Sequence, residues 1–279
     1  MIEERRLTCW SKFKDEITRI RKEYGYHTDE TSEGQQKNTV LFRGHCNATW
    51  SIKTTLERAL ERKRNANTVD IEKYMGWAYF CLNEIESITG RRWDLPTLPR
   101  IREEVYNNND EFRCYLPAYD FLVYLRHHGF PSPLLDWSES PYVAAFFAFL
   151  DEARPRAKRV AILAYIDSLG STKSNWGGSS TITLKGPLVT TDPRHFAQKA
   201  WYTVATKWDG KKRCFCPHED ILSRRETNQD LLIKITLPSS ARKEALTELS
   251  DYNINPFTLF QTEDALIRTM ELKQFDLED

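Results

Sequence analysis

The sequence predicts an α+β protein. Several segments place apolar residues at the spacing of an amphipathic helix, and several shorter runs of apolar and β-branched residues, bounded by Gly, Pro, Ser or Asp, are typical of strands. Aromatic residues make up 12% of the 279 residues, which favours a well-packed globular core over a disordered or fibrous chain. A chain of this length can form one large domain or two small ones.

The first half of the chain reads as mainly helical. Residues 3–25 place five apolar side chains at helical spacing, which predicts an amphipathic helix, and the polar run 28–38 predicts a loop. A helical pattern returns at 56–89, interrupted by the loop RKRNAN and ended by RRWDLPTLPR with its two prolines. We expect the stretch from about 56 to 115 to be a helical insert.

Two helices have clear end signals. The first is predicted from Pro117 to His128, with Gly129 placed for a left-handed C-terminal cap. The second begins with Ser140 as N-cap and Pro141 at the first helical position; it is apolar all round through Leu150, which predicts burial. The intervening FPSPLLDWS is expected to be a loop. Two further helices, over 239–249 and 263–274, are expected to close the chain.

Strands are predicted where apolar or β-branched runs are short. One covers residues 39–42 and ends at Arg43-Gly44, and the others cover 159–166, 201–206 and 231–237. These runs predict a core of strands. No internal repeat and no low-complexity tract interrupts the pattern.

Composition narrows the class of protein. The 40 basic and 40 acidic residues cancel, so no long-range field argues for nucleic acid or an anionic membrane as an obligatory partner. The charged start MIEERRLTCW lacks the apolar region of a secretory signal, and no stretch has the length needed to cross a bilayer. Six scattered cysteines suit a reducing compartment. We therefore expect a cytoplasmic protein without a membrane partner.

Arg43 is the first candidate functional residue. It stands at the end of an apolar strand and is followed by Gly44, which lets a ligand or a neighbouring chain approach the backbone closely. A guanidinium group there can donate two parallel hydrogen bonds to a pyrophosphate or a carboxylate. The structural alternative is an arginine paired with a buried carboxylate that holds the fold together, and Asp136 is the candidate partner.

The segment from Arg126 to Ser140 is the second candidate, because polar residues gather there between two apolar helices. Capping of the second helix explains Ser140 and is a structural alternative for Asp136. His128 is open to two interpretations: it can interact with the carbonyl end of the first helix, or it can act chemically. Together, these observations predict a working site where the Arg43 segment meets this one.

Other polar clusters carry weaker signals. Cys214-Phe-Cys216-Pro-His218 has the residue types of a metal site, but no second ligand pair stands at a recognisable spacing, so we expect no metal. The basic runs 62–64 and 211–213 are short and flanked by Asn, Asp or Gly. Solvated loops explain both runs.

Two motifs carry a family resemblance. Phe42-Arg43-Gly44 and, much later, LRHHGFPSPLLDWSESPYVAAFFA over 125–148 resemble the signature of FRG-domain proteins. Weaker agreement continues through Arg194, Gln198, the run 201–203 and NINPFTLF over 253–260. The resemblance covers about residues 38–270. It implies an N-terminal helix and loop at 1–37 and an FRG domain at 38–279, with the helical insert inside it.

FRG domains in turn resemble the ADP-ribosyltransferase fold, which implies a split antiparallel β core that clamps NAD as the substrate. By this resemblance Arg43 supports the NAD phosphates and ribose, and Ser138-Glu139-Ser140 contacts the nicotinamide ribose. Gly44, His45 and Asp136 complete the expected cofactor-binding set. Arg43, His128 and Gln198 form the expected catalytic set, in which His128 would orient the ribose or act as a base on the acceptor.

Gln198 departs from the pattern of that fold, which places a glutamate there. A neutral amide can bond a ribose hydroxyl, but it supplies no negative charge to the cationic transition state. The activity is then modified, or another carboxylate such as Asp136, Glu139 or Glu219 takes over this role.

Three functions follow as expectations. The first is an ADP-ribosyltransferase or NAD glycohydrolase acting on a macromolecule, protein or nucleic acid, with a role as a toxin or phage-defence effector and an antitoxin or defence partner. The second is a non-catalytic module that binds a nucleotide, a nucleic acid or a protein in the same cleft. The third is a hydrolase that uses His128 with Asp136.

Overall fold

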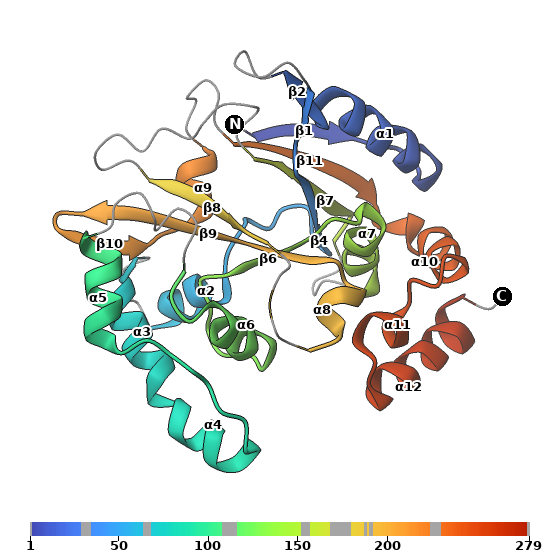
Figure 1. Cartoon of the computed structure of the whole chain (residues 1–279). Coiled ribbons are helices and arrows are strands. Elements are labelled where there is room, and N and C mark those ends of the chain that lie inside the picture. Colours follow the sequence, from blue (N-terminus) through green and yellow to red (C-terminus); the bar gives the residue numbers. More distant parts are fainter. Residues whose placement is uncertain are drawn as a thin grey trace.

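The computed structural model describes residues 2–28, 35–63, 68–107, 116–151, 157–167, 180–186, 189, 192–223 and 230–277. Over these ranges the protein is a mixed α/β fold with a nine-stranded, mostly antiparallel sheet crossing its middle (Figure 1). The sheet order is β1-β11-β7-β4-β6-β9-β10-β5, and β8 pairs with β9. Its strands are β1 (Ile2–Arg6), β4 (Val40–His45), β5 (Val69–Asp70), β6 (Leu135–Ser138), β7 (Arg159–Ile166), β8 (Thr181–Lys185), β9 (Ala200–Asp209), β10 (Lys212–Phe215) and β11 (Leu231–Pro238).

Among these strands only β1 and β11 pair in parallel; the other pairs are antiparallel. A separate two-stranded ribbon joins β2 (Tyr26–Thr28) to β3 (Gln35–Lys37). The strands predicted at 159–166, 201–206 and 231–237 are confirmed as β7, β9 and β11, and β9 extends further on both sides. The strand that carries Arg43 is also confirmed, but it continues through His45 because β4 stays paired with β7 over its whole length.

The helices form two main groups (Figure 1). One lies at the lower left and consists of α2 (Thr55–Arg62), α3 (Ile71–Phe80), α4 (Leu82–Thr89), α5 (Leu98–Asn107) and α6 (Tyr119–His127). The other lies at the right and consists of α7 (Pro141–Leu150), α10 (Arg242–Asp251), α11 (Pro256–Phe260) and α12 (Glu263–Glu271), followed by a π-helical turn (Leu272–Leu277). Three remaining helices are α1 (Phe13–Tyr24), α8 (Arg194–Ala197) and α9 (His218–Leu222). No helix among the described residues has the length and apolar character to traverse a lipid bilayer.

The prediction of one helix over 3–25 is wrong for its first part. Residues 2–6 form β1 at the edge of the sheet, a 3-10 turn follows at Trp10–Lys12, and α1 begins only at Phe13. Arg5 explains the difference, because its guanidinium is buried and bonds Glu3, Glu16 and Glu23. The open edge of β11 supplies backbone partners that a helix would forgo. The apolar side chains of α1 nevertheless pack into the core beside α7.

The segment FPSPLLDWS, expected to be a loop, contains the strand β6. Leu135–Ser138 pairs with β9 over four residues and with β4 through Phe42 and Ser138 alone. Four residues after two prolines carry too little local signal for a strand, so the flanking strands decide the conformation. Beyond Phe42, β4 and β6 diverge while each keeps its other neighbour.

The helix predicted from Ser140 is confirmed. The Ser140 hydroxyl accepts a hydrogen bond from the backbone N–H of Val143, and Pro141 occupies the first helical position. Gly44 of β4 lies against this helix so closely that a Cβ atom there would come within 2.0 Å of the carbonyl oxygen of Ala144. The glycine after Arg43 therefore serves helix packing.

Both helical groups pack on the same face of the sheet. Phe42 packs with the core around α7, and Tyr202 packs with the core around α3 and α6. The pairs Phe42–Ser138 and Asp136–Tyr202 lie directly opposite each other across neighbouring strands, so these side chains share one face. A third core, which includes Leu41, Trp137 and α9, covers the other face. A gap between the two helical groups thus exposes the middle of the first face.

Candidate functional site

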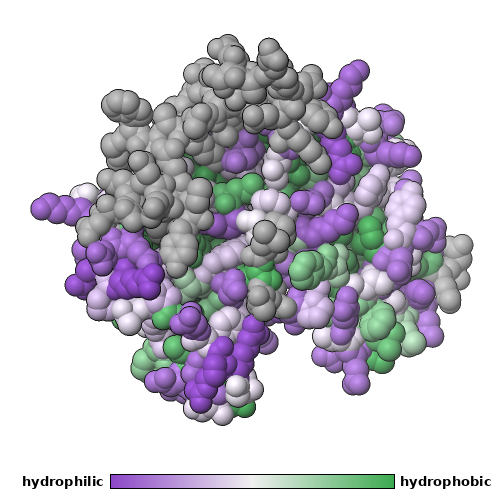
Figure 2. All heavy atoms as spheres, in the orientation of Figure 1, coloured by the Kyte–Doolittle hydropathy of each residue, from purple (hydrophilic) through white to green (hydrophobic). Residues whose placement is uncertain are grey.

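A cleft of about 870 Å³ opens between the two helical groups, where β4 and β6 diverge. Figure 2 shows a notch in the outline between the lobe that contains α4 and the lobe that contains α12. The volume is within the range of sites for small-molecule ligands. The cleft is lined by Phe42, Arg43, Gly44, His45, Cys46, Trp50, Ser51, Lys53, Arg58, Glu61, Arg126, His127, Asp136, Trp137, Ser138, Ala144, Phe147, Arg194, Gln198, Ala200, Tyr202 and Phe260.

The Arg43 side chain spans the gap between the diverging strands β4 and β6. Its Nη1 donates a hydrogen bond of 2.8 Å to the backbone oxygen of Asp136 and lies 3.6 Å from the carboxylate. Its Nε donates to Nε2 of His45 at 3.3 Å. Arg126 from α6 makes a hydrogen-bonded ion pair with the same carboxylate. Two guanidinium groups therefore share one acid, which agrees with the structural interpretation of Arg43 and leaves net positive charge.

Burial and charge shape the pKa values in this cluster. Burial acts to raise the pKa of Asp136, but Arg126 and Arg43 outweigh it and hold that pKa below its usual range. Burial likewise acts to lower the pKa of Arg126, and Asp136 reverses the shift. For Arg43, burial dominates and lowers the pKa. The Asp136 side chain is 36% exposed, so the carboxylate is ionised and open to the cleft at its floor.

Several buried nitrogen atoms around the cleft make no hydrogen bond within the described part of the chain. They are Nε of Arg126, Nε of Arg194 and Nδ1 of His45. Because Nε2 of His45 accepts from Arg43, the proton of the neutral ring belongs on Nδ1, which makes this atom a donor. Buried donors without acceptors are costly, so the donor set suits an anionic or carbonyl-bearing ligand.

Another part of the cleft lining is less charged. Phe147 and Phe260 pack edge to face, with ring centroids 5.9 Å apart, and Ala144 lies on the same helix as Phe147. The side-chain amide of Gln198 donates a hydrogen bond to the backbone oxygen of Leu259, and its backbone oxygen accepts one from the Ser138 hydroxyl at 2.7 Å. Gln198 is thereby fixed at the apolar part of the cleft.

The structure brings most of the predicted site residues together. Those that line the cleft are Arg43, Gly44, His45, Asp136, Ser138 and Gln198. His128 does not line it: this exposed residue ends α6, and its ring lies 4.4 Å from that of Tyr124. Ser140 does not line it either, since its hydroxyl caps α7.

Only one of the three carboxylates considered as substitutes for the missing glutamate lies in the cleft. That residue is Asp136. Glu139 is exposed outside and accepts from the Trp201 indole, and Glu219 accepts from the backbone N–H of Ile52. The cleft contains a further acid, Glu61, whose carboxylate pairs with Lys53 at 2.6 Å.

Sequence reasoning missed a second set of cleft residues. Trp50 and Lys53 belong to the loop between β4 and α2, Arg58 and Glu61 to α2 at the start of the expected insert, and Arg194 to the short helix α8. Arg194 belongs to the weaker part of the family resemblance but was not predicted as a site residue, and the others stand in no recognisable motif. One sequence signal was available for Arg58. Thr54 and Glu57, three residues later, form a capping box, which fixes the start of α2 and hence the direction in which Arg58 points.

The Cys214–His218 segment lies elsewhere. Cys214 and Cys216 are buried, and Nε2 of His218 hydrogen-bonds the Thr203 hydroxyl at 2.9 Å. Over the residues that the structure describes, no group of three or more His, Cys, Asp or Glu side chains is arranged to hold a metal ion.

Comparison with known families gives one match. Residues 38–157 match the model of the FRG domain. This match supports the identification of this segment as an FRG domain. No curated protein and no solved structure matched the chain. The FRG segment contains the whole Arg43–Asp136–Arg126 cluster, whereas Arg194, Gln198 and Phe260 lie C-terminal to the matched residues.

Two histidines of the cleft, His45 and His127, and the buried His218 outside it predict a loss of stability in acid. Burial lowers the pKa of His45 to about 3, with Arg43 acting in the same direction, and lowers that of His218 to about 3. Burial and then Arg194 lower that of His127 to about 4. The unfolded chain binds these protons near pH 6.5, so stability present above pH 6.5 falls as the pH drops toward 4.

We expect His45 and His218 each to contribute a loss of roughly 1.4 kcal/mol per pH unit in this window. Urea denaturation at pH 7, 6, 5 and 4 measures the slope. In the His218→Gln variant, the slope of the unfolding free energy against pH should decrease by the contribution of one proton, which is roughly 1.4 kcal/mol per pH unit. An unfolding free energy that stays constant between pH 7 and 5 would contradict the expected burial of neutral imidazoles.

Proposed function

We propose that the cleft binds NAD and that the protein cleaves the bond between nicotinamide and ribose, transferring ADP-ribose to a macromolecule or to water. The observation that carries this proposal is the convergence of Arg43, Ser138 and Gln198 on one cleft from three separate segments. The resemblance of FRG domains to the split antiparallel core of ADP-ribosyltransferases supports the same choice of substrate.

The residues present suit such a ligand. The Nε–H groups of Arg126 and Arg194, which make no hydrogen bond among the described residues, and the outer Nη2 of Arg43, which donates to no described protein group, are suited to a pyrophosphate. The apolar part offers the Phe147 and Phe260 rings to a planar nicotinamide. The amide of Gln198, held there by Leu259, offers its oxygen to a ribose hydroxyl.

Asp136 is the acid best placed to compensate for the neutral Gln198. Its carboxylate is ionised and reaches the cleft floor, where it can stabilise positive charge that develops on the ribose as nicotinamide leaves with the bonding electron pair. Arg43 and Arg126 partly neutralise the negative charge of Asp136. A phosphate group that binds these two arginines would reduce this neutralisation, so that Asp136 would stabilise the positive charge on the ribose more strongly.

Release of nicotinamide from NAD tests the proposal. We expect the wild-type protein to release it, and Gln198→Ala to lose the release while keeping NAD affinity within a few fold. Arg43→Lys keeps the positive charge but loses the planar fork, so NAD affinity should fall by about tenfold or more in calorimetric titration. Arg19→Lys, on the exposed face of α1, is the matched control.

Failure to bind NAD and to release nicotinamide would refute the assignment. Binding of NAD without release would favour the second candidate, a non-catalytic nucleotide-binding module, which the neutral Gln198 supports. Circular dichroism of each variant separates loss of fold from loss of function.

A further inference from the structure

A continuous row of arginines leads from the cleft floor to the outer surface. Arg43 and Arg126 share Asp136, Arg58 lies within electrostatic range of both, and Arg62 acts on Arg58 in turn. Arg58 and Arg62 stand four residues apart on α2, so they lie on the same face of that helix, and both are exposed. The row therefore extends beyond the volume of the cleft.

The positive charge exceeds what one pyrophosphate needs. The nearby carboxylates are Asp136 at the floor, Glu61 paired with Lys53, and Glu57, which is buried and accepts from the backbone N–H of Thr54. Arg58 makes one described hydrogen bond, from Nη1 to the backbone oxygen of Lys53. Its charge and that of Arg62 lie outside the Arg43–Asp136–Arg126 cluster; Arg58 lines the cleft and Arg62 stands one helical turn further along α2.

An aromatic ring stands beside this row. Trp50 lies in the loop between β4 and α2, lines the cleft, and is 50% exposed. Its ring meets that of His45 edge to face, with centroids 6.3 Å apart, which leaves a face of the indole open. Exposed aromatic rings next to a row of cations are typical of surfaces that bind single-stranded nucleic acid, where bases stack and phosphates follow the positive charge.

We infer that the rim formed by Trp50, Arg58 and Arg62 binds single-stranded nucleic acid and presents it to the cleft as the acceptor of ADP-ribose. An acidic peptide would use the arginines but not the open indole face. A duplex keeps its bases stacked and cannot offer one to Trp50. The role as acceptor rests on the proposed function, whereas the binding itself does not.

Fluorescence anisotropy with labelled oligo-dT and oligo-U of twelve nucleotides, without NAD, tests the binding. We expect affinity to fall steeply with salt, and the log–log salt slope to decrease by about one in Arg58→Gln and again in the double variant with Arg62→Gln. Trp50→Ala should weaken binding by about tenfold. The matched controls are Arg19→Gln and Trp77→Ala; Trp77 is 40% exposed on α3, away from the cleft.

The two oligonucleotides differ in the 2′-hydroxyl, so their relative affinities show whether RNA or DNA is preferred. Absence of binding at 50 mM salt, or equal losses in the control variants, would overturn the inference. So would transfer of ADP-ribose to a protein at a rate unaffected by excess oligonucleotide. If oligonucleotides bind as expected but NAD is not turned over, the proposed function fails while the binding surface stands.

Discussion

Gly44→Ala is expected to destabilise the protein by about 3 kcal/mol or more, which is at the upper end for overpacking. The added Cβ would lie 2.0 Å from the carbonyl oxygen of Ala144 and 2.5 Å from the backbone nitrogen of Ala148. Both atoms belong to the backbone of α7, so no side-chain rotation relieves the clash. Either β4 or α7 must shift, and the floor of the cleft shifts with it.

Urea denaturation measures this effect, with Gly76→Ala as the matched control. Gly76 lies within α3 and has no atom within 4 Å of an added Cβ, so alanine there should stabilise the helix by about 0.5–1 kcal/mol. Adding Ala148→Gly to Gly44→Ala should not restore stability, because the clashing atoms remain. A wild-type denaturation midpoint for Gly44→Ala would disprove the close packing of β4 against α7.

Asp136→Asn is expected to cost about 2–3 kcal/mol of stability. Removing one partner from a fully buried ion pair costs about 3–5 kcal/mol. We expect a smaller loss here because the Asp136 side chain is 36% exposed, so that solvent screens part of the interaction. The variant leaves Arg43 and Arg126, each with 17% of the side chain exposed, without their shared counter-charge. Pyrophosphate in the buffer should then raise the melting temperature of the variant more than that of the wild type.

Asp276→Asn provides a control with the same exposure. Asp276 is 37% exposed and pairs with Arg242, itself 17% exposed, and neither residue lines the cleft. We expect this change to cost about 1 kcal/mol or less and to show no special response to pyrophosphate. Equal losses in the two variants, or no extra stabilisation of Asp136→Asn by the anion, would contradict the view that Asp136 neutralises an anion-binding cluster.

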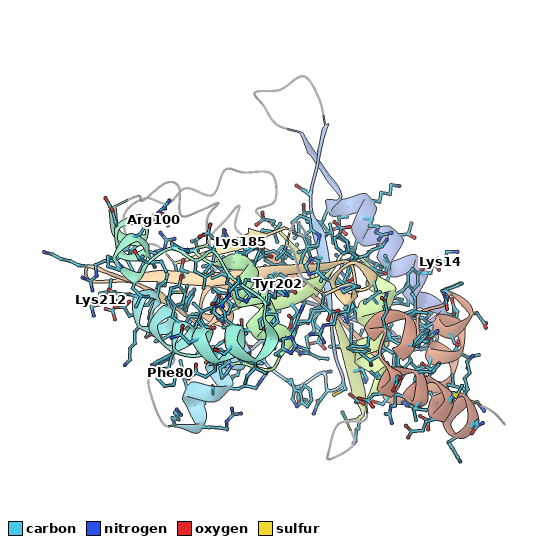
Figure 3. The ribbon with its side chains drawn as sticks, turned by 60° about the horizontal axis from the view of Figure 1, so that its bottom comes forward. Lys14, Phe80, Arg100, Lys185, Tyr202 and Lys212 are labelled. Carbon is cyan, nitrogen blue, oxygen red and sulfur yellow. The ribbon has the colours of Figure 1, made fainter. Side chains whose placement is uncertain are left out.

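The position of Tyr202 illustrates why the cleft could be predicted only in part. Figure 3 shows Tyr202 near the middle of the molecule, whereas Phe80 projects at its margin. The Tyr202 hydroxyl hydrogen-bonds Nε2 of His127 at 2.9 Å and lies 3.4 Å from Nδ1 of His195. The motif drew attention to His128, but the helix phase of α6 directs His127 to the cleft and His128 to solvent. His127 and His128 are neighbours in sequence, but they point in different directions from α6, and only His127 belongs to the site.

Some helices and strands depend only on residues close to one another in sequence, and these elements could be predicted from the sequence. The cap Ser140, the following proline and the apolar run define α7 within ten residues, and β-branched runs with turn residues at both ends define β7 and β11. The short apolar run over 39–42 likewise predicts the strand that leads to Arg43. These features depend on neighbours in sequence, so the sequence alone determined them.

Tertiary structure decided what depends on distant partners. β1 and β6 are strands because β11 and β9 pair with them, and Arg126, Arg58 and Arg194 join Arg43 only because α6, α2 and α8 pack beside the point where β4 and β6 diverge. The free energy of strand pairing and of burying an ion cluster comes from contacts between segments far apart in sequence, such as Ile2 with Leu232 and Arg43 with Asp136, which no local pattern records. For the same reason, the sequence indicated Arg43 and Asp136 as partners, and only the fold placed them in a cationic cleft.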